Sequence, residues 1–107
     1  MIDAKEAKRR SETSVSLRLE KATKWVEGEI FYIEEDIEDA ALKGKYKTTY
    51  WWSLGILDEI GITQEEAQIA LTSALAPFGY ELGFIFDNLR LEAQCKTFEI
   101  IIDWKKA

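Results

Sequence analysis

The sequence predicts an α+β fold in which a long amino-terminal helix packs against a three-stranded sheet. Three observations predict this fold. Apolar residues recur every three or four positions between Val15 and Leu42, which is the spacing of one helix face. Three later segments alternate apolar with polar residues, as β-strands do. A capping box from Thr63 to Glu66 marks a second helix between the first and second of these strands.

The long helix is predicted to begin near Ser14 and to end at Leu42, because Gly44 follows as a residue suited to a helix stop. A capping box that begins at Asp3 predicts a separate helical turn before it, over Ala4–Arg10. The apolar stripe of the long helix is expected to face the core. It consists of Val15, Leu19, Ala22, Val26, Ile30, Ile33, Ile37 and Ala40.

The length of this helix has a consequence for the whole molecule. A helix over Val15–Leu42 would be about 42 Å long, whereas a compact domain of this size is about 34 Å across. The helix must therefore bend near Gly28, or overhang the domain and be covered by a second copy or another partner. We expect a single domain, 1–107, with residues 1–13 as a mobile amino-terminal segment.

The first strand is predicted over Lys45–Trp52, a segment rich in β-branched and aromatic residues. Its alternation places Tyr50 and Trp52 on one face and Trp51 on the other. The segment Ser53–Ile62 is expected to be a connector with room for one helical turn, because it contains two glycines and a short apolar run.

The second helix begins after Thr63 and is predicted to end at Pro77 and Gly79. Alternating apolar residues then predict the second strand over Tyr80–Phe86 and the third over Lys96–Trp104. Because these two strands are consecutive, we expect them to pair antiparallel.

Residues 87–94 between the last two strands are predicted to form either a long hairpin loop or an extension of the strands. In the third strand, Phe98, Ile100 and Ile102 share one face, and Ile101 lies on the other. Apolar residues on both faces indicate that the third strand is central in the sheet.

The composition excludes several kinds of active site. The chain has no histidine and one cysteine, Cys95, so it cannot build a Ser-His-Asp triad, a Cys-His pair or a His- or Cys-rich zinc site. It also lacks the glycine-rich phosphate-binding motifs. We therefore expect a protein that is not an enzyme and uses no cofactor or metal ion.

The sequence also lacks targeting signals. The first residues, MIDAKEAKRRSE, contain no apolar core of a signal peptide. No apolar run approaches the roughly 18 residues of a transmembrane helix. We expect the protein to stay in the cytoplasm, with no membrane partner.

Charge is unevenly distributed along the predicted helix. The net charge is −6; residues 1–26 carry seven basic and four acidic side chains, whereas residues 27–42 carry seven acidic and no basic ones. The acidic block could hold a metal ion, could mimic nucleic acid, or could be a solvated or partner-facing surface; we favour the last. The basic part could contact phosphate, but we favour its pairing with the acidic half of a second chain laid antiparallel, and we do not expect nucleic acid as a partner.

Aromatic and acidic residues give the candidate interface. Trp51 is either covered by a helix or exposed as an anchor for a partner, since tryptophan and tyrosine concentrate binding energy at interfaces. No catalytic, cofactor-binding or metal-binding residue is predicted. The candidate interface residues are Trp25, Tyr32, Glu34, Glu35, Glu38, Asp39, Tyr50 and Trp51.

Several short motifs punctuate the chain: an Ala-x-x-Ala-Lys start, an Ile-x-x-Ala-Ala-x-x-Gly-x-Tyr ending of the long helix, a Gly-Tyr after the second helix and a final Ile-x-Trp. The residues concerned are Ala4, Ala7, Lys8, Ile37, Ala40, Ala41, Gly44, Tyr46, Gly79, Tyr80, Ile102 and Trp104. In this layout the chain resembles small α/β proteins of unassigned function encoded by tailed bacteriophages and prophages. The resemblance implies a place in the bacterial cytoplasm during infection, or in the virion, and carries over no catalytic residue.

Together these observations predict a non-enzymatic phage or prophage accessory protein that acts by protein–protein interaction. We expect a homodimer whose partner is a host or phage protein, with modulation of a host factor as one role. Two alternatives stay open: an accessory structural protein of the virion head or tail, and an acidic inhibitor that mimics nucleic acid.

Overall fold

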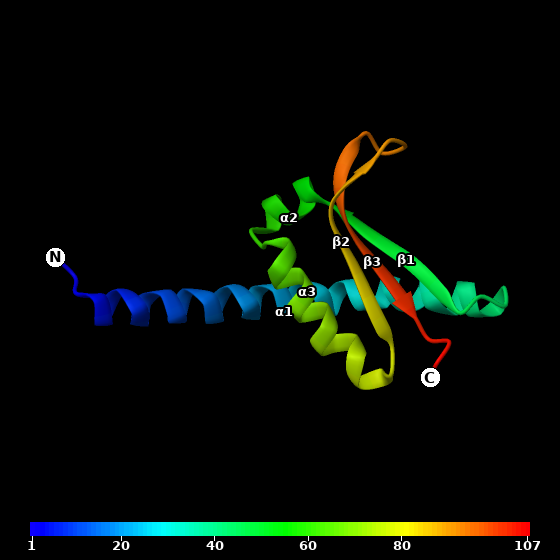
Figure 1. Cartoon of the computed structure of the whole chain (residues 1–107), viewed down its shortest axis with the longest axis horizontal. Helices are drawn as coiled ribbons and strands as arrows, with labels where there is room; N and C mark the ends of the chain where they lie inside the picture. Colours follow the sequence, from blue (N-terminus) through cyan, green and yellow to red (C-terminus); the bar gives the residue numbers. More distant parts are fainter.

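Three antiparallel strands and the helices on one face of them make up the molecule (Figure 1). The computed structural model describes the whole chain, residues 1–107. The elements are α1 (Ala4–Leu42), β1 (Lys47–Ser53), α2 (Leu54–Ile60), α3 (Gln64–Leu75), the 3-10 turn η1 (Ala76–Phe78), β2 (Glu81–Arg90) and β3 (Cys95–Asp103). The strand order is β1-β3-β2, and both pairs are antiparallel. The predicted α+β class and the antiparallel pairing of the last two strands are confirmed.

Helix α1 is continuous, so the prediction of a separate turn over Ala4–Arg10 and a new start near Ser14 is wrong. Asp3 caps the helix by accepting a hydrogen bond from the Glu6 amide at 2.8 Å. The Ser- and Thr-rich segment that resembles a second cap stays helical. Its Thr13 hydroxyl donates to the Arg9 carbonyl oxygen one turn earlier, at 3.0 Å, which satisfies the side chain inside a helix.

The overhang predicted for α1 is present. The molecule measures 60 × 34 × 20 Å, and the first turns of α1 extend beyond the other elements (Figure 1). The helix continues through Gly28 without interruption, so no break shortens it. The apolar stripe divides accordingly: Val15 is 56% exposed, whereas Ala22 and Ile33 are fully buried.

The projecting part of α1, residues 4–17 (hereafter the arm), ends where Arg18 contacts α3. The Arg18 guanidinium donates two hydrogen bonds to the Glu66 carboxylate, at 2.8 and 3.1 Å. Glu66 also completes the predicted capping box, because its carboxylate accepts from the Thr63 amide at 2.7 Å and its own amide donates to the Thr63 hydroxyl at 3.1 Å. One carboxylate therefore caps α3 and fixes the base of the arm.

This contact makes the stability of the protein depend on pH. Arg18 holds the pKa of Glu66 below its ordinary value, so the ion pair stabilises the fold fully above the unfolded-state pKa of about 4.3 and is lost as pH falls through the lower folded-state pKa. In Arg18→Gln we expect a lower melting temperature at neutral pH and a smaller loss of melting temperature on acidification below about pH 4. Thermal melts across pH check this, with exposed Lys8→Gln as the control. Parallel curves for wild type and Arg18→Gln would contradict it.

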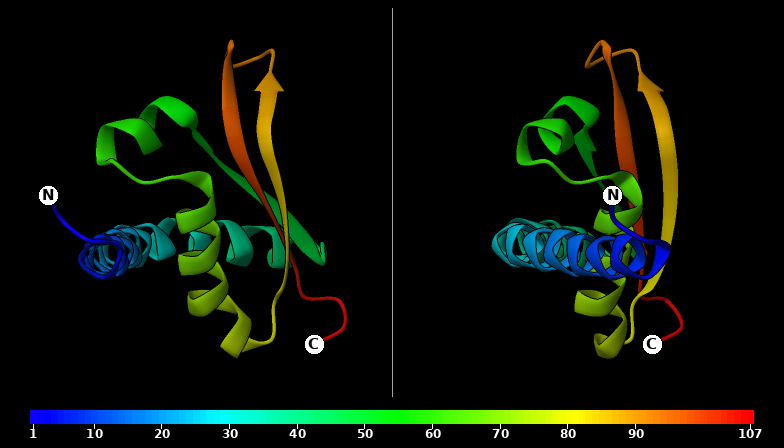
Figure 2. Two further views of the ribbon diagram at one scale, coloured as in Figure 1. Left: turned by 60° about the vertical axis from the view of Figure 1, so that its left-hand side comes forward. Right: turned by 90° about the vertical axis from the view of Figure 1, so that its left-hand side faces the viewer.

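The core lies between the sheet and the helices, which all cover the same sheet face (Figure 2). In the middle of this layer Phe98 is fully buried, and its ring is roughly parallel to those of Phe84 and Trp52, with 5.6 and 6.2 Å between ring centroids. The buried core residues are Ala22, Val26, Ile33, Ile37, Trp52, Leu57, Ile62, Ala67, Ala70, Leu71, Leu75, Phe98, Ile100 and Ile102.

Strand β3 is central, as the sequence predicted, but no helix covers its second face. Ile101 is half-buried there because its neighbours lie across the sheet. Thr49 and Gly83 are its partners on β1 and β2, and Ile101 Cβ lies 3.6 Å from the position that a Gly83 Cβ would occupy. This separation is an ordinary van der Waals contact, so Ile101 packs closely over β2 at this position.

The segment after β1 is more helical than predicted. Helix α2 makes about two turns, capped by the Ser53 hydroxyl, which accepts from the Ile56 amide at 3.2 Å. It ends at Gly61, whose φ of +86° is left-handed. Leu57 is 2% exposed, and the burial of its apolar side chain stabilises this helix. The two glycines of the segment had led us to predict a connector there.

The last two strands extend into a long hairpin, so the second of the two predicted alternatives for residues 87–94 is confirmed. Strand β2 runs to Arg90, and a tight turn closes with the Gln94 amide donating to the Leu91 carbonyl oxygen at 3.2 Å. The register shifts between Ile85 and Asn88. This bulge extends the strand past the position where the sequence alternation ends.

Candidate protein-interaction surfaces

The first surface is the outer face of α1, on the side away from the core. Leu17, Phe31 and Leu42 are 61%, 63% and 88% exposed. Their separations of 14 and 11 residues are close to whole numbers of helical turns, so they lie along one line of the helix. Gly28 lies one turn before Phe31, and a side chain there would meet nothing within 4 Å. On this line Phe31 meets the ring of its neighbour Tyr32 edge to face, with 5.6 Å between ring centroids.

The side chains of the acidic block, residues 27–42, differ in how far they are exposed. Glu34, Glu35 and Glu38 are exposed on α1. Asp39 is paired with Lys43 at 2.9 Å. Glu29 is half-buried instead and accepts a hydrogen bond from the Trp52 indole nitrogen at 2.8 Å. No group of three acidic or cysteine side chains is close enough to hold a metal ion.

Two of the aromatic residues predicted for the interface, Trp25 and Tyr50, pack at the margin of the core. Trp25 lies against Trp52 with 4.5 Å between ring centroids, and Tyr50 meets Trp52 edge to face at 5.6 Å. Burial, together with the negative charges of Glu29 and Asp36, raises the pKa of Tyr50, so this phenol stays neutral. Tyr32 differs, because it is 53% exposed on α1.

Trp51 alternates along β1 with Trp52, which is buried against the helices, so its side chain lies on the opposite face of the sheet, where it is 39% exposed. The Arg90 guanidinium lies over its ring, 5.1 Å from the centroid. Of the two arrangements predicted for Trp51, the structure has the one without a covering helix. The stacked arginine orders the ring at this surface.

The second surface is the open edge of β1. The Trp104 amide donates to the Tyr46 carbonyl oxygen at 3.0 Å, which places the even-numbered residues of this segment in hydrogen-bonded pairs with β3. The odd-numbered residues Lys47, Thr49 and Trp51 therefore direct their backbone groups to the other side. No strand or side chain bonds those groups, so the edge can accept another strand.

The other edge of the sheet, on β2, is interrupted by the bulge. At the bulge Asp87 has a φ of +50°, and its amide donates to the Gln64 side-chain oxygen at 3.0 Å. Bulges and covering side chains are the usual means by which sheets prevent edge pairing. Strand β1 has a regular register from Lys47 to Ser53, so its edge has no bulge over its whole length.

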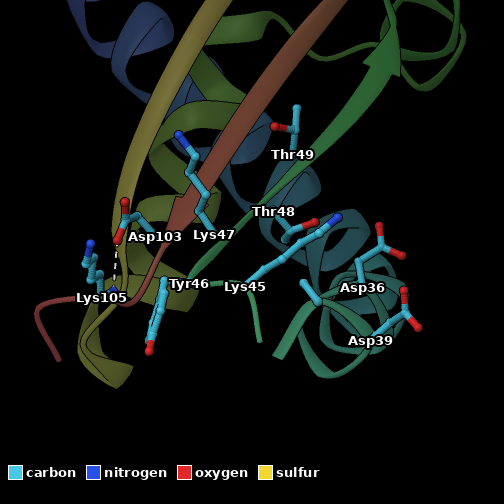
Figure 3. Close-up of a pocket in the computed structure, with 10 residues that line it drawn as sticks. Asp36, Asp39, Lys45, Tyr46, Lys47, Thr48, Thr49, Asp103 and Lys105 are labelled. Carbon is cyan, nitrogen blue, oxygen red and sulfur yellow. Dashed lines mark hydrogen bonds between the residues drawn. The ribbon is translucent and has the colours of Figure 1, made fainter. Parts of the chain in front are cut away.

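A groove of about 760 Å³ lies beside the start of this open edge, between β1 and the end of α1 (Figure 3). Asp36 and Asp39 line it from α1, and Lys45 and Lys47 line it from β1 and the turn before it. The rest of its lining is Ala40, Tyr46, Thr48, Thr49, Asp103 and Lys105. The groove offers backbone groups and charges of both signs but no nucleophile paired with a base, so its chemistry suits binding.

Comparisons with protein-family models, curated proteins and solved structures find no match for this chain. No helix combines the length and the apolar character that crossing a bilayer requires.

The structure distributes the predicted interface residues over three places. Tyr32, Glu34, Glu35, Glu38 and Asp39 lie on the surface of α1, Trp25 and Tyr50 pack at the core margin, and Trp51 lies on the sheet face away from the helices.

Two features escaped the sequence interpretation. The line of Leu17, Phe31 and Leu42 could have been found from its spacing. The open edge of β1 depends on the strand order, for which the sequence offered only the apolar residues on both faces of the third strand.

Proposed function

We propose that the protein is a non-enzymatic accessory protein of a tailed phage or prophage that acts by binding a host or phage protein. The observation that supports this most directly is the unpaired, regular edge of β1 beside a polar groove. An extended segment of a partner could add to this edge by backbone hydrogen bonds, with side chains at alternate positions giving specificity.

The groove favours a particular kind of segment. On the helix side Asp36 presents negative charge, whereas on the strand side Lys45 and Lys47 present positive charge. A strand that adds to β1 directs alternate side chains to these two sides. Basic residues toward α1 alternating with acidic or polar residues toward the outer sheet face would therefore fit best.

A proline at position 49 tests this mode of binding. The Thr49 amide points to the open edge, so Thr49→Pro removes no hydrogen bond of the sheet, and edge positions tolerate proline. We expect extended peptides selected from a displayed random library to bind Thr49→Pro at least about tenfold more weakly than wild type, a difference of about 1.4 kcal/mol. Titration calorimetry measures the affinities.

The matched control is Thr49→Ala, which removes the side chain but keeps the amide and should bind peptides as wild type does. Selected peptides that bind Thr49→Pro and wild type equally would exclude strand addition. The biological setting needs a separate observation: a fixed copy number in purified phage particles would make the protein a virion component instead.

A further inference from the structure

We infer that two copies of the chain associate through the outer faces of their α1 helices, laid antiparallel. This deepens the proposed protein-binding function by naming one partner, a second copy of the chain. Its failure would leave strand addition at β1 unaffected, because α1's outer face and the β1 edge are separate surfaces.

Exposed apolar residues define the contact line. Leu17, Phe31 and Leu42 follow one side of α1, and each is more than half exposed. The core does not use this side, since its own stripe, which includes Ala22 and Ile33, lies on the other. Large apolar side chains aligned on one exposed helix face are a feature of helix–helix interfaces.

The distribution of charge along α1 favours both a particular partner and a particular orientation of the two helices. The first 26 residues carry a net charge of +3, and residues 27–42 carry −7. A parallel pair would place the two acidic segments together, whereas an antiparallel pair places each basic arm against the acidic segment of the other copy. The chain itself carries both complementary halves, so a second copy is the partner that this pattern fits.

One register pairs opposite charges and brings two of the three apolar residues together, whereas Leu42 lies opposite Glu6 of the second copy. With the two-fold axis at Lys24, Leu17 lies opposite Phe31 of the second copy, and Arg10 lies opposite Glu38 of the second copy. Gly28 lies opposite Glu20 of the second copy, and the absence of a side chain at Gly28 lets the helices approach closely there.

The two Lys24 side chains, one from each copy, meet at the two-fold axis, and carboxylates lie near both of them. Lys24 Nζ lies 3.8 Å from a carboxylate oxygen of Glu20 in its own helix. In the pair, Glu20 of the second copy lies about one turn from the same lysine, so two positive charges are flanked by two negative ones.

The arrangement accounts for the projecting arm. Each arm lies along the second copy's α1, and the two globular parts lie on opposite sides of the helix pair. The edge of β1 stays open in each copy, so dimer formation and strand addition are compatible.

Sedimentation equilibrium of the full chain at low ionic strength tests the inference. We expect a dimer that weakens as salt is added, because most of the selecting charges are exposed. Phe31→Glu and Arg10→Glu should each weaken association by about tenfold or more. The double variant Arg10→Glu with Glu38→Arg reverses both members of one pair and should restore wild-type association.

Lys8→Glu is the matched control. It makes the same charge change on the same arm, but Lys8 lies seven residues before Val15 and so on the opposite side of the helix. It should leave the dissociation constant close to that of wild type. All substituted residues are exposed, and circular dichroism establishes that each variant is folded.

Two results would overturn the inference. One is a monomer at every concentration tested at low ionic strength. The other is a dimer that responds to Lys8→Glu as strongly as to Arg10→Glu, or that the reversed pair fails to restore. If Phe31→Glu did not fold, the double variant Arg10→Glu with Glu38→Arg would by itself decide whether the inference holds.

Discussion

Replacing Ile33 with aspartate is expected to unfold the protein. Ile33 is fully buried in the middle of α1, among the largest side chains of the core. Loss of the isoleucine costs about 2–5 kcal/mol, and a buried carboxylate without a partner costs several kcal/mol more. Domains of this size have a free energy of unfolding of only about 5–15 kcal/mol. The summed cost of the substitution is therefore comparable to the whole stability of the protein. Loss of the cooperative melt by far-UV circular dichroism would establish unfolding.

Val15→Asp is the control for this prediction. Val15 belongs to the same helix stripe, but it lies on the arm and is 56% exposed. The same kind of substitution there should change the free energy of unfolding by less than about 1 kcal/mol. If Ile33→Asp melted like wild type, or if Val15→Asp unfolded the protein, the division of the stripe into a buried and a projecting part would be wrong.

Truncation of Phe98 to alanine should lower the free energy of unfolding by about 3–5 kcal/mol. Phe98 is fully buried on the central strand. Its ring contacts three others, with centroids of Phe86, Phe84 and Trp52 at 5.3, 5.6 and 6.2 Å. Removing it leaves a cavity that the surrounding sheet cannot close, because β1 and β2 are held on either side of β3. Urea denaturation followed by tryptophan fluorescence measures the change.

Phe78→Ala removes the same ring from η1, where it is 77% exposed. We expect a change within about 0.5 kcal/mol. Equal losses for the two variants would show that the aromatic layer around Phe98 is not the main source of stability.

The sequence predicted part of the candidate interface. It found the charge division of α1 and the exposed positions Tyr32 and Glu38, because helical periodicity separates a buried side from a solvated one. It could not show that the ring of Trp25 packs on Trp52, because this neighbour on β1 is distant in the sequence. The sequence could not show the role of Glu29 either, because its hydrogen-bond partner, Trp52, is 23 positions away along the chain.

The sequence by itself determined the elements whose cause is local. Periodicity identified α1, the capping box at Thr63 identified the start of α3, and alternation identified the three strands, because spacing and capping act within a few residues. The tertiary structure decided what depends on distant contacts. It kept α1 continuous, made α2 a helix by burying Leu57, and paired β3 with both other strands, which the apolar residues on its two faces had only indicated. That strand order leaves the edge of β1 open, which no local pattern encodes, since an unpaired backbone group has the same sequence as a paired one.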